Sequence, residues 1–550
     1  MVDKIVTDVL VVGSGAAGLC AAIAARQGNA ETLIASITSP GAGNTTAVAG
    51  GLINAAIAAD DSPGLHFQDT VRAGLHINDR PLVANMVEAM PRWLPRLEEC
   101  GVEFLKEEGE YVPSRSPGHT RARTLQFRPR IGLSLSRPLA ETARRMGAKV
   151  LHDFNIVKIL VHHDCAVGAI GYRWDTDEIV HVAAGAVVLA TGGASLVYRR
   201  TRIPPGVPGD GYGIALDAGL TLQDMEFVQF YPTVCAEPGE AKWMIGYDYW
   251  LKAGAVFRNA LGEDIVAKHG LPEPELITRD QLSIAIGREI YEGRGIEGTV
   301  LMDTSECQRN LESTLYRDSA FVRLVRERWA KGQDRLAGNV LVAPANHSYM
   351  GGIQTIVTGE TSVEALLACG EVAGGAHGAN RLQGNSLSEA VVAGSEAGRT
   401  AAIIARSSRS RVSEKAVSET AQRLRDALRR QSGTPVREIL RALQSTMTAK
   451  AALVRDQQGL QEARAAIDEL RHEIPRAMAI APRDRSLLCT LPQLLDTAEC
   501  IVLSALARRE SRGAHYRCDH PERDDRAWVT HITCTKRGGQ IATATSPVRR

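Results

Sequence analysis

A glycine-rich turn close to the start of the chain restricts the possible folds more than any other feature. Gly13-Ser-Gly-Ala-Ala-Gly18 follows the apolar run Asp8–Val12 and leads into a helical pattern. In such a strand–turn–helix unit the first glycine makes the turn, the second lets the backbone approach a pyrophosphate, and the third permits close helix packing. With a second strand at Thr32–Ser36, residues 7–36 are predicted to form a βαβ unit that binds a dinucleotide.

The end of the second strand indicates a ribose contact that is unusual for NAD. NAD-type sites place an acidic residue there, whereas this chain has Ser36. Three further turns combine glycine with a polar group, at Thr191-Gly192-Gly193, Gly209-Asp210-Gly211 and Gly370-Glu371. We therefore expect a dinucleotide site assembled from distant segments.

A late segment, residues 377–387, indicates which dinucleotide is bound. Asn385-Ser386 opens a helical run, and Ser386 has capping-box spacing to Glu389. A helix N-terminus carries partial positive charge and unpaired N–H groups, which suit the N1/O2 edge of a reduced flavin. Arg381 precedes the turn glycine Gly384 by only a few residues. Its guanidinium can bind a carboxylate with two parallel hydrogen bonds.

Bulk properties exclude several classes. A chain of 550 residues suits two or three domains, and 64 basic against 63 acidic residues give no electrostatic case for nucleic acid. The N-terminus has no export signal, and no apolar run is long enough to predict a membrane span. Ten scattered cysteines without Cys-x-x-Cys predict no metal or iron–sulfur site, and they fit the cytoplasm.

Secondary-structure patterns change along the chain. Helices are predicted at 83–101 and 132–147, and strands at 150–161, 165–173, 179–182 and 186–193. Charged helical patterns cover 410–430, 436–474 and 487–508, and residues 520–550 read as a strand or arm followed by a frayed tail. The expected domains are 1–232 and 341–407 (two parts of one cofactor domain), 233–340 (an insertion), 408–515 (helical) and 516–550 (arm and tail).

The motifs, taken in order, resemble the flavoprotein subunits of succinate dehydrogenase and fumarate reductase, and L-aspartate oxidase. The resemblance implies an α/β fold with a split Rossmann-like FAD-binding domain, an inserted α+β capping domain and a C-terminal helical domain. It rests on Gly13–Gly18, Asn44–Gly51, Ala190–Gly193, Gly209–Gly211, Gln229–Thr233, Glu289–Gly295, His347–Ile353, Gly378–Leu387, Glu510–Tyr516 and Arg523–Asp525.

The resemblance also implies which residues bind FAD. Asn44 stands where the respiratory enzymes carry the histidine that links covalently to the flavin, so FAD is expected to be non-covalent. The predicted cofactor residues are Gly13, Ser14, Gly15, Ala16, Ala17, Gly18, Ser36, Asn44, Thr45, Gly50, Gly51, Thr191, Gly192, Asp210, Glu371, Asn385, Ser386 and Leu387.

Family members exchange a hydride between flavin N5 and a carbon of a small dicarboxylate. His347 aligns with the family's substrate-binding histidine and Arg381 with its carboxylate-binding arginine. Tyr231 replaces a second substrate histidine, and Tyr247-Asp248 replaces a Thr-Glu pair that binds a carboxylate. These five residues are the predicted catalytic set.

The family's proton-transfer arginine is harder to locate. Counting back from Glu289 without gaps puts Ile284 in its place, and isoleucine transfers no proton. Arg279 and Arg288 are near in sequence. Because Arg288 lies four residues from Ile284, it is predicted to share the same helix face.

Three functions remain open at this point. The preferred hypothesis is an FAD-dependent oxidoreductase acting on a small carboxylic acid other than the family's usual substrates. The second is fumarate reductase, succinate dehydrogenase or L-aspartate oxidase activity, with the proton-transfer arginine supplied from elsewhere. The third is a flavin-binding electron-transfer subunit without substrate chemistry of its own. An iron–sulfur or other electron-transfer protein is a possible partner in each case.

Overall fold

The structure is a computed structural model, and it describes every residue except 1, 237–243, 275, 306, 308–338 and 408–413. The described part of the chain separates into two compact units. The larger unit comprises residues 1–228 and 348–550, and the smaller unit comprises residues 229–347. The finer division into five parts stays a prediction.

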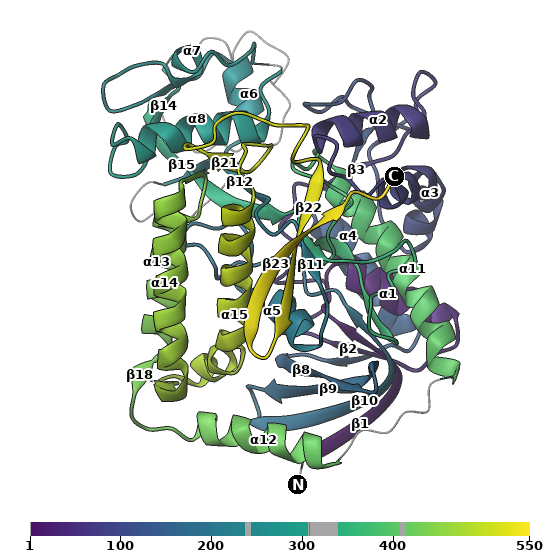
Figure 1. The fold of residues 1–550 in the computed structure, drawn as a ribbon. Coiled ribbons are helices and arrows are strands. Elements are labelled where there is room, and N and C mark those ends of the chain that lie inside the picture. The colour runs from purple at the N-terminus through teal and green to yellow at the C-terminus, as the bar shows by residue number, and fades with distance from the viewer. Residues whose placement is uncertain (1, 237–243, 275, 306, 308–338, 408–413) are drawn as a thin grey trace, which may run out of the picture. The chain divides into compact units, whose positions relative to one another are not determined.

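A seven-stranded mixed sheet forms the centre of the larger unit (Figure 1). Its core strand β1 pairs in parallel with β2 and β10. The last four residues of β1 are apolar and buried, which is typical of a strand inside a parallel sheet. Strands β10, β9 and β8 continue the sheet as antiparallel neighbours. The strands are β1 (Asp3–Val12), β2 (Thr32–Ala35), β7 (Lys149–Leu151), β8 (Phe154–His162), β9 (Cys165–Arg173), β10 (Glu178–Leu189) and β17 (Leu366–Ala368).

The separate strands predicted at 179–182 and 186–193 are one strand. β10 runs without a break from Glu178 to Leu189. The intervening small residues stay extended because their ladder with β1 continues, as the pairing of Thr7 with Ala184 shows. The helical pattern predicted at the glycine-rich turn is confirmed as α1 (Ala16–Gln27).

Small residues let two long helices approach each other beside this sheet. α1 (Ala16–Gln27) packs against α11 (Asn385–Ser407). A Cβ atom at Gly394 or Gly398 would lie 2.3 or 2.1 Å from a carbonyl oxygen of α1, so only glycine fits there. The helices α2 (Pro63–Ala73), α3 (Arg80–Glu99), α4 (Leu133–Arg145) and α5 (Asp210–Asp217) complete this part of the larger unit.

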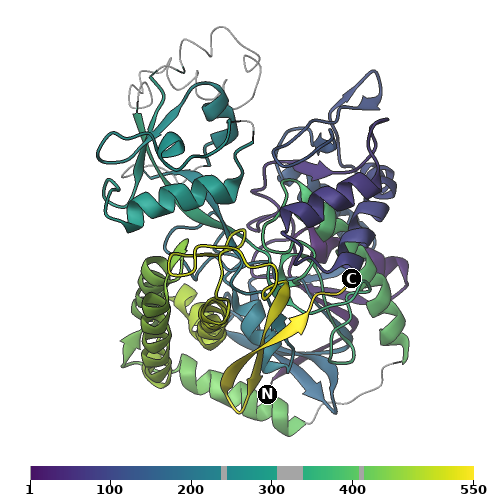
Figure 2. The ribbon, with the colours of Figure 1, turned by 45° about the horizontal axis from the view of Figure 1, so that its top comes forward.

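Four more helices follow in the larger unit. α12 (Glu414–Leu428) packs its apolar side on β8, β9 and β10. The predicted run 436–474 is two helices, α13 (Val436–Lys450) and α14 (Gln457–Glu473), which lie side by side with α15 (Pro482–Ala507) (Figure 2). Among the described residues, α15 is long and apolar enough to cross a membrane, but 83% of its most apolar window is buried inside the protein. A helix in the core of a protein can have the same length and apolar composition.

The predicted frayed tail is wrong. The last segment is a hairpin of β22 (Thr530–Arg537) and β23 (Gln540–Pro547), joined to β11 (Leu222–Gln223) and β16 (Gly352–Ile353). Arg549 then forms an ion pair with buried Asp79. Polar composition suggested disorder, but the edge of β11 and a buried carboxylate hold this segment.

The smaller unit is an α+β insertion. Its sheet has the order β12-β15-β14-β13, from β12 (Val228–Cys235), β13 (Val256–Arg258), β14 (Val300–Asp303) and β15 (Asn339–Tyr349). The helices α6 (Tyr247–Lys252), α7 (Ile265–Lys268) and α8 (Arg279–Tyr291) share one apolar core with the sheet.

These observations confirm the predicted fold class: a parallel-sheet α/β domain split by an α+β insertion, with helices towards the C-terminus. Short elements complete the described chain: β3 (Leu52–Asn54), β4 (Lys106–Glu107), β5 (Glu110–Tyr111), β6 (Thr124–Gln126), β18 (Thr434–Pro435), β19 (Val454–Arg455), β20 (Ala477–Met478), β21 (Tyr516–Arg517), η2 (Gly370–Val372) and η3 (Ile474–Arg476).

Candidate functional site

The turn between β1 and α1 is shaped by the three motif glycines. Gly13 has φ +115°, and a Cβ atom there would lie 2.2 Å from the carbonyl oxygen of Ala190. At Gly18 a Cβ atom would lie 2.1 Å from the carbonyl oxygen of Gly13. Gly15 precedes α1 and gives it no side-chain cap. The N–H of Ala16 donates to the Thr46 hydroxyl at 3.0 Å, and the next N–H groups of the first turn suit an anion. We call this turn, with Ser14, Ala16 and Ala17, the cofactor cradle, because the sequence predicts that it binds the cofactor.

Two predicted residues fasten the cradle to its neighbours. Ser36 follows β2, and its hydroxyl lies 2.6 Å from that of Ser14. Asn44 donates its amide to the carbonyl oxygen of Ser14 at 3.1 Å and accepts from the backbone N–H of Ala47 at 3.0 Å. Asn44 is therefore engaged by the protein itself, and its amide is no nucleophile for a covalent bond to a flavin.

Other predicted residues leave polar atoms or space at the cradle. Within the described part of the chain, no hydrogen-bond partner is seen for the buried hydroxyls of Thr45 and Thr191. Buried hydroxyls are ordinarily satisfied, so such a pair fits a polar ligand. A Cβ atom at Gly50 would meet nothing within 4 Å, whereas Gly51 (φ +68°) and Gly192 (φ +78°) shape the adjoining turns.

Two buried carboxylates flank these turns. Asp210 begins α5, and burial raises its pKa to about 7. Glu371 in η2 accepts a hydrogen bond from the backbone N–H of Tyr349 at 2.9 Å. Burial raises the pKa of Glu371, although the Arg381 guanidinium counteracts the rise. A carboxylate at this point suits the hydroxyl groups of a ribose.

The start of α11 is held by a buried polar network that the sequence did not reveal. Asn385 accepts from Asn54 at 2.7 Å and lies 2.8 Å from the His66 imidazole, while His119 lies 3.0 Å from the carbonyl oxygen of Gln383. Burial lowers the pKa of both histidines to about 4, so they are neutral at pH 7. No sequence signal joins such distant residues.

The capping box predicted for α11 is not formed as expected. The helix begins at Asn385, so Ser386 and Leu387 lie inside its first turn. The Glu389 carboxyl group accepts from the backbone N–H of Gly370 instead, and burial raises its pKa to about 8. The N-terminal N–H groups of α11 still lie beside the loop that carries Arg381.

Arg381 is buried, at 8% exposure, and belongs to the larger unit. Its charge acts on Glu371 and on His377. Burial, assisted by that charge, lowers the pKa of His377 to about 3, so the guanidinium is the charged group of this loop. It has the chemistry that a carboxylate requires.

The smaller unit gathers the other predicted catalytic residues around Tyr231. The Tyr231 ring lies 5.9 Å from the Tyr247 ring and 5.5 Å from the His347 ring, both in edge-on contacts. Asp248 lies in the first turn of α6, and its charge helps burial to raise the pKa of Tyr231. Tyr231 and Tyr247 therefore remain protonated near pH 7, as hydrogen-bond donors rather than bases.

The cation of this cluster is Arg279, not Arg288. The Arg279 guanidinium carbon lies 5.5 Å from the centre of the Tyr231 ring. Arg288 is near His269 (3.4 Å) and Glu292 (3.6 Å). Counting back from Glu289 without gaps placed Ile284 at the position of the proton-transfer arginine. In the structure the positive charge beside Tyr231 comes from Arg279, the first residue of α8. We call Tyr231, Tyr247, His347 and Arg279 the tyrosine cluster.

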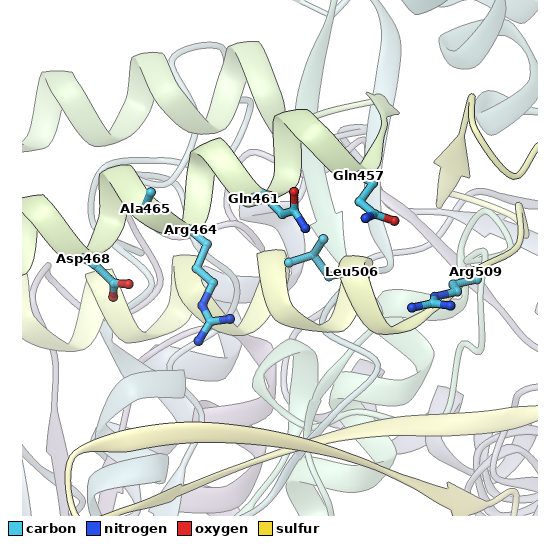
Figure 3. Close-up of a pocket in the computed structure, with 7 residues that line it drawn as sticks. All are labelled: Gln457, Gln461, Arg464, Ala465, Asp468, Leu506 and Arg509. Atoms are coloured by element: carbon cyan, nitrogen blue, oxygen red, sulfur yellow. The ribbon is translucent and has the colours of Figure 1, made fainter.

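A surface groove of about 460 Å³ between α14 and α15 is unrelated to these residues. Figure 3 shows its side chains, which are mostly polar and belong to the two helices and the residues after α15. They are Gln457, Gln461, Arg464, Ala465, Asp468, Leu506 and Arg509. None of them was predicted to bind cofactor or substrate.

Comparisons with known proteins cover almost the whole chain. Residues 8–387 match the FAD binding domain family, and residues 440–549 match the fumarate reductase flavoprotein C-terminal family. A fumarate reductase (CoM/CoB) subunit of Methanothermobacter marburgensis is 36% identical over 530 residues, which cover 94% of each chain. L-aspartate oxidase of Caulobacter vibrioides is 31% identical over 536 residues, which cover 95% of each chain.

A solved structure shows the same agreement. The FrdA chain of Escherichia coli quinol fumarate reductase has a TM-score of 0.88 and 30% sequence identity. The similarity covers 100% of this chain and 97% of that chain.

Proposed function

Because the chain belongs to the FAD-dependent oxidoreductase family of fumarate reductase and succinate dehydrogenase flavoproteins and L-aspartate oxidase, we propose that it oxidises or reduces a different small carboxylic acid. Membership makes the protein an FAD-dependent oxidoreductase. FAD, when bound, supplies a hydride acceptor or donor at N5. The observation that carries the choice of substrate is the tyrosine cluster, where two phenol rings stand in place of a histidine and a threonine.

The larger unit supports non-covalent FAD. Backbone N–H groups of the cofactor cradle suit the pyrophosphate, and the buried hydroxyls of Thr45 and Thr191 suit polar atoms of the cofactor. Glu371 suits the ribose, and the N-terminus of α11 suits the anionic edge of the flavin. Asn44 is compatible with this arrangement because it forms its hydrogen bonds within the protein.

A basic residue of the larger unit supports the binding of a carboxylate, because the Arg381 guanidinium can donate two parallel hydrogen bonds to it. In the smaller unit, His347 offers an imidazole beside Tyr231. Arg279 is the third candidate, as a charged group that holds or moves a proton beside Tyr231. The protonated phenols of Tyr231 and Tyr247 present a mostly apolar wall, because the Tyr247 hydroxyl donates to the carbonyl oxygen of Ile277 at 3.2 Å. This wall favours a larger or more apolar substituent over a second carboxylate.

Fumarate reduction is the second candidate function. The charge of Arg279 beside Tyr231 supplies the cation that the ungapped count did not find, and Asp248 adds a carboxylate. The relative from Methanothermobacter marburgensis is named a fumarate reductase (CoM/CoB). In that case a dicarboxylate binds in the presence of the two tyrosines, and they do not select against it.

We also propose a partner and a location. Relatives are named as subunits, which supports an electron-transfer partner such as an iron–sulfur protein. Ten cysteines without a disulfide among the described residues support a reducing, cytoplasmic location. The balanced charge supports no nucleic-acid partner.

An anaerobic flavin-absorbance screen tests the proposed function. Oxidised protein is mixed with succinate, L-aspartate and alkyl- or aryl-substituted acids, and reduced protein with fumarate and the corresponding unsaturated or 2-oxo acids. We expect a substituted monocarboxylic acid to change the flavin spectrum faster than any dicarboxylate. Fast reoxidation by fumarate would establish the second candidate. Reduction only by a partner protein would indicate an electron-transfer subunit.

A further inference from the structure

The segment that carries Arg381 rests on one turn between α2 and α3. We call residues 374–381 the carboxylate loop and residues 74–79 the supporting turn. Three backbone positions of the loop are hydrogen-bonded to the turn, so the turn fixes where the loop lies. These bonds join Asp79 N to Gly375 O (2.9 Å), Asn78 Nδ2 to Ala376 O (3.0 Å), and Ala379 N to Gly74 O (2.9 Å).

The side chain of Asp79 also limits the loop by direct contact. Gly375 has φ +102°, and a Cβ atom there would lie 2.4 Å from Oδ2 of Asp79 and 2.8 Å from Nε2 of Gln223. The loop backbone therefore lies against the Asp79 carboxylate with no room for a side chain. A shift of this carboxylate towards the loop would press on Gly375.

The Asp79 carboxylate is held by two basic residues of the C-terminal hairpin and its extension. Oδ1 lies 3.2 Å from Nε2 of His531, and Oδ2 accepts from Nη2 of Arg549 at 2.6 Å. The other imidazole nitrogen of His531 lies 2.5 Å from the Asp224 carboxylate. Asp79, His531 and Asp224 are almost fully buried.

This pairing has to be ionic. Burial opposes a charge on His531, but the carboxylates of Asp224 and Asp79 outweigh that effect and raise its pKa to about 10. A buried carboxylate that loses its cation retains an uncompensated charge, and it moves towards other donors. The Asp79 carboxylate lies against the backbone of the carboxylate loop at Gly375.

We propose that His531 and Arg549 are positioning residues that hold the carboxylate loop through Asp79, and so set how tightly Arg381 binds a carboxylate. They touch neither substrate nor cofactor in this scheme. The inference rests on the proposed function only in assigning a substrate carboxylate to Arg381.

The test compares Arg549→Gln with a matched control in full-length, FAD-loaded protein. Arg549 is the better first choice because its side chain is 39% exposed, whereas removal of buried His531 endangers folding. The control is Arg471→Gln, which removes a similarly exposed arginine from the buried carboxylates of Asp496 and Glu499, between α14 and α15. Arg549→Lys keeps a cation beside Asp79 and serves as the conservative variant.

Two readouts separate positioning from stability. The first is the Kd of the monocarboxylate butyrate, measured by its perturbation of the flavin spectrum. The second is hydrogen–deuterium exchange of peptides that contain residues 374–381. We expect Arg549→Gln to weaken butyrate binding roughly tenfold and to speed exchange of the loop. Arg549→Lys should recover most of both effects, and Arg471→Gln should change neither.

The two readouts also separate this inference from the proposed function. Unchanged exchange and unchanged butyrate affinity in Arg549→Gln would overturn the positioning role. If wild-type protein shows no response to butyrate, the carboxylate site assigned to Arg381 is wrong. Exchange of the loop then decides the positioning role alone: faster exchange in Arg549→Gln supports it, and equal exchange overturns it.

Discussion

The cofactor cradle of the larger unit and the tyrosine cluster of the smaller unit are built in opposite ways. The cradle is made from backbone: it has three glycines within six residues, and at Gly13 and Gly18 a Cβ atom would collide with a carbonyl oxygen. The tyrosine cluster is made from side chains that four separate elements contribute, β12, α6, α8 and β15.

This difference indicates which of the two regions can change its ligand specificity. Backbone N–H groups bind phosphate whatever the neighbouring side chains are, so the cradle can persist while the substrate changes. Side chains such as Tyr231 can be replaced without altering the sheet that carries them. We infer that cofactor identity is fixed by the first region and substrate identity by the second.

The largest expected effect lies in the cradle. Gly13→Ala places a Cβ atom 2.2 Å from the carbonyl oxygen of Ala190 at a φ of +115°. The strain is about 3 kcal/mol or more, which corresponds to a loss of FAD affinity of roughly 100-fold. Equilibrium dialysis of FAD measures it. Gly64→Ala, at an exposed position of α2 where a Cβ atom would meet only Ser62 Oγ at 3.8 Å, is the control and should bind FAD normally. If Gly13→Ala bound FAD with normal affinity, the cradle would not depend on its glycine backbone, and the contrast with the tyrosine cluster would be wrong.

The next effect lies in the tyrosine cluster. Arg279→Gln removes the cation beside Tyr231, and turnover of the acid identified by the flavin screen should fall by about 10²–10³. FAD content should not change, because the cradle lies in the other unit. Arg288→Gln, on the same helix, should retain nearly full turnover. Equal losses in the two variants would show that α8 acts only through its stability.

A smaller change is expected from restoring the family's residues. The double variant Tyr231→His, Tyr247→Thr removes the phenol wall, so reoxidation of the reduced protein by fumarate should accelerate roughly tenfold relative to wild type. Stopped-flow absorbance measures the rate. A slower rate with fumarate would mean that the tyrosines take part in the reaction rather than select the substrate.

The smallest effect concerns the ionic support of the carboxylate loop. The pKa of His531 is raised to about 10, above the value near 6.5 of an unfolded histidine. Its contribution to stability is therefore complete below about pH 6.5 and is lost as the pH rises through about 10. The charged groups packed around it are Asp79, Asp224, Arg508 and Arg549. Thermal unfolding from pH 8 to 10.5 should show a steeper fall of Tm in wild type than in His531→Gln. Parallel curves would contradict the assignment.

Sequence reasoning reached the cradle more fully than the cluster, for a physical reason. The pattern Gly13-x-Gly-x-x-Gly18 is local, so strand, turn and helix α1 were predicted closely. The position of Arg279 depends on where α8 begins relative to β12, which no local pattern encodes. The ungapped count placed Ile284 there, and helix periodicity then favoured Arg288.

The ends of elements and the buried networks were also beyond local patterns. The hairpin β22–β23 was predicted only as a strand or arm, because its order depends on pairing with β11 far away in sequence. His66 and His119 gave no signal, since each is held by residues more than 260 positions further along the chain. Long-range contacts of this kind come from the fold and are not visible in spacing.

The central claim is that a hydride passes between a carbon of a small carboxylic acid and FAD on this chain. Its most direct measurement is the anaerobic bleaching rate of the flavin with the acid that the screen identifies, compared with the same acid deuterated at carbons 2 and 3. We expect the deuterated acid to bleach the flavin more slowly, because the carbon–hydrogen bond is broken in the step observed. Equal rates, with the chemical step shown to limit bleaching, would contradict it.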